Sequence, residues 1–197
     1  MLADTRLNSV LAAVRLETCS EAWVNISLYQ WRSTLLTAAG SKISGGRFHR
    51  KGKAPALYFA KSPVVALLEV GALAKAQDGA LVPISRPPQM LVSANITIPA
   101  GILDLIDSAR RRELKTNLQE LTGLWVLEPY PATQRLGQAA YDSNRIVAIR
   151  YPSSLGQQLE PNLVVFVDRL LAHAGARLEA HDPNGDLPKT VRPLVGP

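Results

Sequence analysis

Four short runs rich in branched and aromatic residues constrain the fold of this chain more than any other feature. They are ALYFA (56–60), LVSANITI (91–98), IVAIRY (146–151) and NLVVFV (162–167). Runs of this length and composition are typical of buried β-strands. Because segments with helical features lie between them, the sequence predicts an α+β fold in which helices surround a sheet.

Helical features are clearest in three segments. Apolar residues within 2–18 recur at helical spacing, which predicts an amphipathic helix near the N-terminus. Ser62 and Pro63 form a favourable helix start, because serine caps free amides and proline has a suitable φ. We expect that helix to run to about Ala76. Thr133 can cap a further helix.

The composition suits one domain in a reducing compartment. The chain has 197 residues, of which 47% are apolar, so it can bury a core. Cys19 is the only cysteine, which excludes an intrachain disulfide and a cysteine-rich zinc site. The histidines lack the spacing of metal ligands, so we expect no metal. No run resembles a signal peptide or a membrane span, so we expect a cytoplasmic protein that contacts no membrane.

Positive charge is concentrated in one stretch. The formal net charge is +6. Between Arg32 and Glu69 all charged residues are Lys or Arg, and the first acidic residue after Arg32 is Glu69. A patch of this kind suits a polyanion such as nucleic acid, a dinucleotide or an acidic protein. The same pattern also fits a solvated basic loop, and composition alone leaves both interpretations open.

Common motifs of phosphate-binding and hydrolytic sites are absent. The sequence has no GxGxxG after a strand, no GxxxxGK[ST] and no GxSxG. The densest candidate is GGRFHRKGKAPALYFAKSPVVALLEV at 45–70. In it, Gly45 and Gly46 allow close approach of the backbone to a ligand, and Arg47 offers a planar fork of donors for a diphosphate.

Tyr58 and Glu69 complete this candidate segment. Tyr58 lies in the expected strand 56–60, where its neighbours face the opposite side. Glu69 interrupts an apolar stretch, so it either points to a cleft or pairs with an upstream arginine. Each residue also has an ordinary structural interpretation, namely a tight turn, a surface arginine, a core aromatic residue or a structural ion pair.

These residues resemble the core motif of the RES domain family, which is named after an arginine, a glutamate and a serine. The matching elements are Trp31-Arg32, Gly45-Gly46-Arg47-Phe48, Gly52, Leu57-Tyr58-Phe59, Leu67-Leu68-Glu69, Tyr151-Pro152-Ser153 and the run that begins at Asn162. Phe48 and His49 depart from the tryptophan and asparagine usual in the family, and the family's later Asn-Pro-His element is not evident.

The resemblance implies a domain organisation and a fold. It covers roughly residues 28–168, so we expect an N-terminal helical extension at 1–27, a RES domain at 28–170 and an irregular C-terminal tail at 171–197. RES proteins resemble ADP-ribosyltransferases, which implies a split, mixed β-sheet core with a central cleft and surrounding helices. The tail is also a candidate arm for docking on a partner subunit, so we expect a homodimer.

The resemblance also implies a function, the toxin of a bacterial toxin–antitoxin pair that consumes NAD by hydrolysis or phosphorolysis. Arg32, Glu69 and Tyr58 are then the expected catalytic residues. The expected NAD-binding residues are Arg32, Gly46, Arg47, Tyr58 and Ser153. NAD is thus a substrate, with inorganic phosphate as an optional second one. The implied partner is an antitoxin with a helix-turn-helix part, through which alone the toxin meets DNA.

Three alternatives remain open at this point. The same cleft suits an ADP-ribosyltransferase in which a protein side chain replaces water or phosphate. A nucleic-acid-binding module would use the patch 47–53 and Arg110–Arg112, although the patch has little aromatic interleaving and the chain lacks a helix-turn-helix signal. The departures at Phe48 and His49 would also fit an interaction protein without catalytic activity.

Overall fold

The fold is that of a computed structural model, which describes residues 1–155 and 160–191. The strands of the main sheet are β1 (Glu17–Leu28), β2 (Ala56–Ala60), β5 (Gln89–Asp104), β6 (Ala148–Pro152), β7 (Pro161–Phe166) and β8 (Arg177–Ala180). The α-helices are α1 (Asp4–Ala13), α2 (Ala39–Ser44), α3 (Pro63–Glu69), α4 (Ser108–Glu113), α5 (Leu118–Thr122), α6 (Ala132–Asp142) and α7 (Val167–Ala172). Two 3₁₀ helices, η1 (Tyr29–Thr34) and η2 (Trp125–Leu127), and a hairpin of β3 (Leu73–Lys75) and β4 (Leu81–Pro83) complete the described elements.

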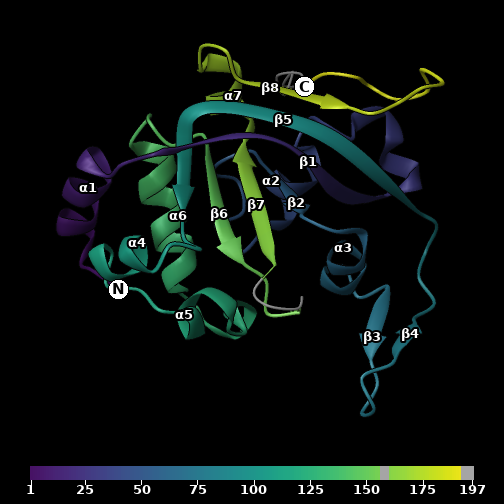
Figure 1. Ribbon diagram of the computed structural model, residues 1–197, viewed down its shortest axis with the longest axis horizontal. Helices are drawn as coiled ribbons and strands as arrows, with labels where there is room; N and C mark the ends of the chain where they lie inside the picture. Colours follow the sequence, from purple (N-terminus) through teal and green to yellow (C-terminus); the bar gives the residue numbers. More distant parts are fainter. Residues whose placement is uncertain (156–159, 192–197) are drawn as a thin grey trace.

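The main sheet is mixed and consists of two parts. Its strand order is β1-β2-β7-β6-β5-β8, and β1 also pairs with β5. The pair β5–β6 is parallel, whereas the other pairs are antiparallel. The long curved strands β1 and β5 arch over the shorter β2, β7 and β6 (Figure 1). The expected α+β fold with a split, mixed sheet core is therefore confirmed.

The split lies between β1 and β2 and creates room for a site. β1 pairs with β5 from Glu17 to Leu28, but it meets β2 only where Val24 faces Ala60. Next to that point the Asn25 amide donates a hydrogen bond to the Tyr58 carbonyl over 2.7 Å, so a side chain replaces the missing strand pairing. The two strands then diverge, and their side chains line a cavity.

Two hydrophobic cores lie on opposite faces of β7. Leu163 and Val165 belong to one core, and Val164 and Phe166 belong to the other. A strand that is buried on both faces needs a continuous apolar run, which explains the sequence of 162–167. Helices α1, α4, α5 and α6 lie together on one side, and α3 and the β3–β4 hairpin lie on the other (Figure 1).

The predicted N-terminal helix is confirmed as α1, but the prediction that all of 1–27 is a helical extension is wrong. Residues 17–28 form β1, and the boundary placed at residue 28 falls at the end of this strand. The strand forms because its backbone pairs with β5 along its length and because Cys19 and Trp23 are buried in the core. Pairing with a distant strand, and not local propensity, decided the outcome.

The expectation of an irregular tail at 171–197 is also wrong for part of its length. β8 pairs with β5, and Leu178 and Ala180 are buried against the sheet. This partner strand is far away in sequence, which is why the short Arg-Leu-Glu-Ala strand was not predicted. Residues 192–197 of the predicted tail lie outside the described residues.

Helix α3 begins where predicted and ends earlier than predicted. The Ser62 hydroxyl accepts a hydrogen bond from the Val65 amide, and Pro63 is the first helical residue. The helix ends at Glu69 instead of near Ala76, because Gly71 adopts a φ of 69° that stops the helix. The chain then forms the β3–β4 hairpin. No helix in residues 1–155 and 160–191 has the length and apolarity needed to cross a membrane.

Candidate active site

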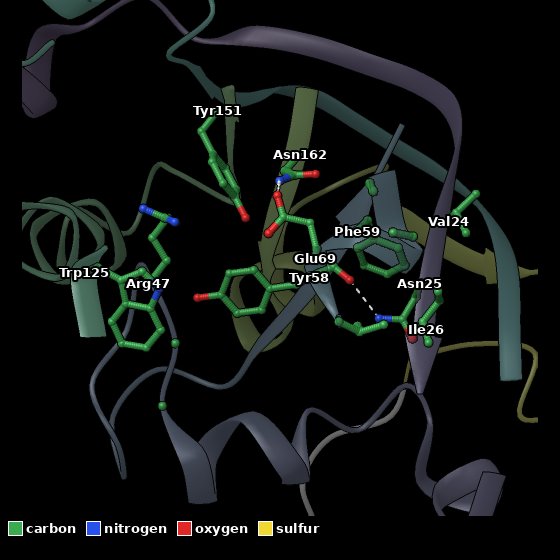
Figure 2. Close-up of a pocket in the computed structure, with 15 residues that line it drawn as sticks. Val24, Asn25, Ile26, Arg47, Tyr58, Phe59, Glu69, Trp125, Tyr151 and Asn162 are labelled. Carbon is green, nitrogen blue, oxygen red and sulfur yellow. Dashed lines mark hydrogen bonds between the residues drawn. The ribbon is translucent and has the colours of Figure 1, made fainter. Parts of the chain in front are cut away.

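A pocket of about 280 Å³ opens at the split of the sheet. Its walls come from β1 and β2, from the segment 45–47, and from the end of α3. Trp125, Tyr151 and Asn162, all distant in sequence, complete the lining. Figure 2 shows the polar side chains of Glu69, Tyr151 and Asn162 converging on this space. The pocket therefore combines an apolar surface with a few fixed polar groups, as ligand sites commonly do.

Glu69 is the last residue of α3, and its carboxylate faces the pocket. Oε1 accepts hydrogen bonds from Ser153 Oγ and from Asn162 Nδ2, each over 2.7 Å. Within the described part of the chain Glu69 forms no ion pair, so it points to a cleft instead of pairing with an upstream arginine. A carboxylate is unfavourable at a helix C-terminus, and the two donors offset this cost.

Ser153 and Asn162 hold this carboxylate in place. Both are buried, with 2% and 3% of their surface exposed. Asn162 lies opposite Tyr151 in the β6–β7 pair, and Ser153 follows β6 directly. Ser153 was expected to bind NAD, whereas here its hydroxyl donates to Glu69. Ser153 is not among the residues that line the pocket.

Tyr58 occupies the middle of β2, which matches the predicted strand 56–60. Its hydroxyl accepts a hydrogen bond from the Phe48 amide over 3.1 Å and lies 2.9 Å from His49 Nδ1. Burial raises the pKa of Tyr58 well above its ordinary value, so this hydroxyl stays protonated at neutral pH. Burial also raises the pKa of Tyr151, which lines the same pocket.

Gly46 allows the turn before β2 to approach Tyr58. A Cβ atom at this position would lie 2.6 Å from the Tyr58 hydroxyl oxygen and 2.8 Å from His49 Cε1. The adjacent Gly45 has a φ of 72° and ends α2. Gly46 therefore serves close packing against Tyr58 and His49, and both glycines also line the pocket.

Arg47 lines the pocket beside Trp125 (Figure 2). Its Nη1 donates hydrogen bonds to the carbonyls of Leu121 and Gly123, over 2.8 and 3.0 Å, at the C-terminal end of α5. Free helix carbonyls favour a cation, so this contact anchors the segment that carries Trp125. The guanidinium retains further donors on its other nitrogen atoms.

Arg32 is not brought to this pocket. It lies on η1 and is exposed, and its guanidinium carbon sits 4.8 Å from the centre of the Tyr29 ring. The structure thus brings together Gly46, Arg47, Tyr58 and Glu69, and it places Ser153 against Glu69. The chain turns away after β1 ends at Leu28, which separates Arg32 from the others.

The sequence analysis missed several residues of the site. Asn162 was matched to a motif but received no role, although a polar residue at the start of an otherwise apolar run was a usable signal. Tyr151 was likewise matched to a motif without a role, whereas Asn25 and Trp125 carried no such signal, because only the fold brings them to the pocket. Within residues 1–155 and 160–191, no group of three or more His, Cys, Asp or Glu side chains could hold a metal ion.

Comparison with known proteins identifies a family for this arrangement. The RES domain family matches residues 22–189. No curated protein sequence matches the chain. A chain in the crystal structure of the M. tuberculosis MbcT–MbcA toxin–antitoxin complex has a similar fold, with a TM-score of 0.65 and 18% identity over 90% of both chains. The family match begins within β1 and ends beyond β8, so both strands belong to the domain. The protein therefore belongs to the RES domain family.

Proposed function

We propose that this protein is the toxin of a toxin–antitoxin pair and that it cleaves the nicotinamide–ribose bond of NAD. The observation that carries the proposal is the Glu69 carboxylate, held by two buried donors at the edge of a pocket that also presents Tyr58 and Arg47. Membership of the RES domain family and the fold shared with a toxin–antitoxin complex support it.

The chemistry needs a fixed negative charge more than a strong acid. Breaking the bond leaves positive charge on the ribose, and the electron pair departs with nicotinamide as a neutral molecule. The carboxylate of Glu69 stabilises that charge, and Ser153 and Asn162 hold it in place. The oxygen of water then bonds to the ribose carbon and loses a proton to solvent, which gives ADP-ribose. With phosphate as the acceptor, the product is phosphorylated ADP-ribose.

The remaining pocket residues suit the rest of the substrate. Tyr58 offers an aromatic face for the nicotinamide ring, and the free donors of Arg47 bind the diphosphate. Gly46 has no side chain, so the backbone of this pocket wall can lie close to the Tyr58 hydroxyl. Arg32 lies outside the pocket, so we propose no role for it at the bond that is cleaved.

A protein partner is part of the proposal. Four exposed apolar side chains follow Gly123, whose carbonyl accepts a hydrogen bond from Arg47. We call them the rim; they are 65–76% exposed and comprise Leu124, Val126, Leu127 and Tyr130. A cluster of exposed apolar side chains beside a pocket is typical of protein contact sites. We propose that the partner is a cognate antitoxin with a helix-turn-helix part. We also propose that the toxin is cytoplasmic and forms a homodimer. The same rim would also suit a protein acceptor of ADP-ribose.

Release of nicotinamide tests the reaction. The purified chain, freed of any antitoxin, is incubated with NAD, with and without inorganic phosphate, and the products are separated by chromatography. We expect release that falls about 100-fold or more in Glu69→Gln and is retained in Glu128→Gln, an exposed carboxylate that does not line the pocket. Phosphate dependence would identify the acceptor. Unchanged release in Glu69→Gln would refute the site, and labelled ADP-ribose on a protein would favour transferase activity.

A further inference from the structure

A chain of hydrogen bonds lies behind the pocket wall and centres on His49. The imidazole is 1% exposed. Its Nε2 lies 2.8 Å from the Ser41 carbonyl oxygen of α2, and its Nδ1 lies 2.9 Å from the Tyr58 hydroxyl of β2. The Phe48 amide completes the chain at that same hydroxyl, over 3.1 Å. His49 thus connects a helix to the aromatic residue of the pocket.

The partners determine which nitrogen carries the proton. A carbonyl oxygen only accepts, so Nε2 must carry the proton that it donates to Ser41. In a neutral imidazole Nδ1 is then an acceptor, and the Tyr58 hydroxyl donates to it. The hydroxyl oxygen in turn accepts from the Phe48 amide. Burial lowers the pKa of His49, and this favours the neutral ring that the arrangement requires.

The surrounding structure leaves the Tyr58 ring little freedom. A tyrosine on a strand has two side-chain torsions, and hydrogen bonds at its hydroxyl restrict both while the backbone is held in place. The backbone end is held by Asn25, which donates to the Tyr58 carbonyl. The hydroxyl end is held by Phe48 and His49, and Gly46 packs against the same atoms. The orientation of the ring in the pocket therefore depends on the acceptor that His49 provides.

We infer that His49 is a positioning residue, which accepts a hydrogen bond from the Tyr58 hydroxyl and thereby fixes the aromatic face that receives the ring of the substrate. This inference rests on the proposed function for the identity of that substrate. His49 itself does not line the pocket, so it acts through Tyr58. A stacking face acts on the bound substrate before and during bond cleavage, so its loss raises KM more than it lowers kcat.

Two substitutions separate the two functions of the imidazole. In His49→Asn the amide oxygen takes the place of Nδ1 and keeps the acceptor for Tyr58. In His49→Gln the amide nitrogen takes the place of Nε2, keeps the bond to Ser41 and removes that acceptor. We expect KM for NAD to rise about tenfold in His49→Gln and to stay within about threefold in His49→Asn, with kcat little changed in both. Thermal unfolding confirms that each variant is folded.

A double-mutant cycle shows whether His49 acts through the hydroxyl. Tyr58→Phe removes the donated proton, so we expect the same rise in KM, and we expect His49→Gln to add nothing in the Tyr58→Phe background. Multiplying effects would mean that His49 acts by packing alone. An effect in His49→Asn as large as in His49→Gln would also overturn the inference.

A spectroscopic test is independent of turnover. In ¹⁵N NMR spectra of the wild-type protein we expect a neutral His49 with the proton on Nε2, and an Nδ1 signal that moves in Tyr58→Phe. The His49→Asn variant identifies the signal, since it lacks this ring and keeps His173 and His181. A proton on Nδ1, or an Nδ1 signal that ignores Tyr58→Phe, would refute the positioning role. If the wild type releases no nicotinamide, the proposed function fails while this result still decides the inference.

Discussion

The two sides of the pocket differ in how firmly their side chains are held. On the strand side, Tyr58 accepts a hydrogen bond from a backbone amide, and Glu69 accepts hydrogen bonds from the buried side chains of Ser153 and Asn162. On the rim side, Trp125 lines the pocket from a 3₁₀ helix of three residues, among exposed apolar neighbours. Preorganised groups suit a chemical step, and exposed apolar groups suit a partner. This difference agrees with the proposal that the strand side carries catalysis and the rim carries recognition.

The difference has a simple origin in the elements that carry the residues. The strand side rests on β2, β6 and β7, which are buried between two hydrophobic cores. The rim follows Gly123 and precedes Pro131, and η2 within it buries no residue. Few buried apolar contacts mean low local stability, so the rim is the side of the pocket better able to adapt to a partner.

The largest effect is expected from a substitution in α6 that displaces the turn packed against Tyr58. A Cβ atom on Gly137 of α6 would lie 1.8 Å from the Phe48 carbonyl oxygen, so Gly137→Ala must displace the turn that contacts Tyr58. We expect the free energy of unfolding to fall by about 3 kcal/mol in urea titrations. Gly40→Ala is the matched control, because nothing lies within 4 Å of its Cβ. Equal effects of the two variants would contradict the packing argument.

A smaller change removes one of the donors that hold the carboxylate. In Asn162→Ala, Glu69 keeps Ser153 and loses the amide, so its orientation is less restricted. We expect nicotinamide release to fall about tenfold with the fold intact, since a hydrogen bond to a charged group contributes about 1.5 kcal/mol. The control is Asn8→Ala on the exposed face of α1. Full activity in Asn162→Ala would show that Ser153 alone orients Glu69.

The pH dependence of stability tests the buried imidazole behind the strand side. The pKa of His49 in the folded protein lies below its ordinary value of 6.5, because burial disfavours the imidazolium form. The unfolded chain therefore binds the proton first as the pH falls, so stability is complete above about pH 6.5 and decreases from there toward the folded-state pKa. We expect His49→Asn to have a shallower decrease in this window, measured by urea unfolding at several pH values. An identical slope in both proteins would mean that folding leaves the pKa of His49 unchanged.

The smallest effect is expected on the rim. Leu127 is 76% exposed, so Leu127→Ser should change the free energy of unfolding by no more than about 0.5 kcal/mol. Nicotinamide release should also stay the same, because Leu127 does not line the pocket. Unfolding and turnover assays check both statements. A loss of turnover would show that the rim belongs to the catalytic part of the site and would weaken the comparison.

Helices and strands could be predicted from the sequence where neighbouring residues alone determine them. The strand 56–60 was predicted with the bounds that β2 has, and the start of α3 followed from Ser62 and Pro63. Gly46, Arg47, Tyr58 and Glu69 lie within one short segment, so their nearness in the fold was visible in the sequence. Arg32 was grouped with them by resemblance, and the turn into η1 separates it.

The amino-acid sequence by itself determined the apolar runs that must be buried, the glycines that permit close packing, and the single carboxylate set into an apolar helix. Only the tertiary structure decided that β1 and β8 are strands, that Ser153 and Asn162 orient Glu69, and that His49 supports Tyr58. The physical reason is that burial and local conformation follow from neighbouring residues. The pairing of distant strands and the matching of distant donors and acceptors depend on the packing of the whole chain.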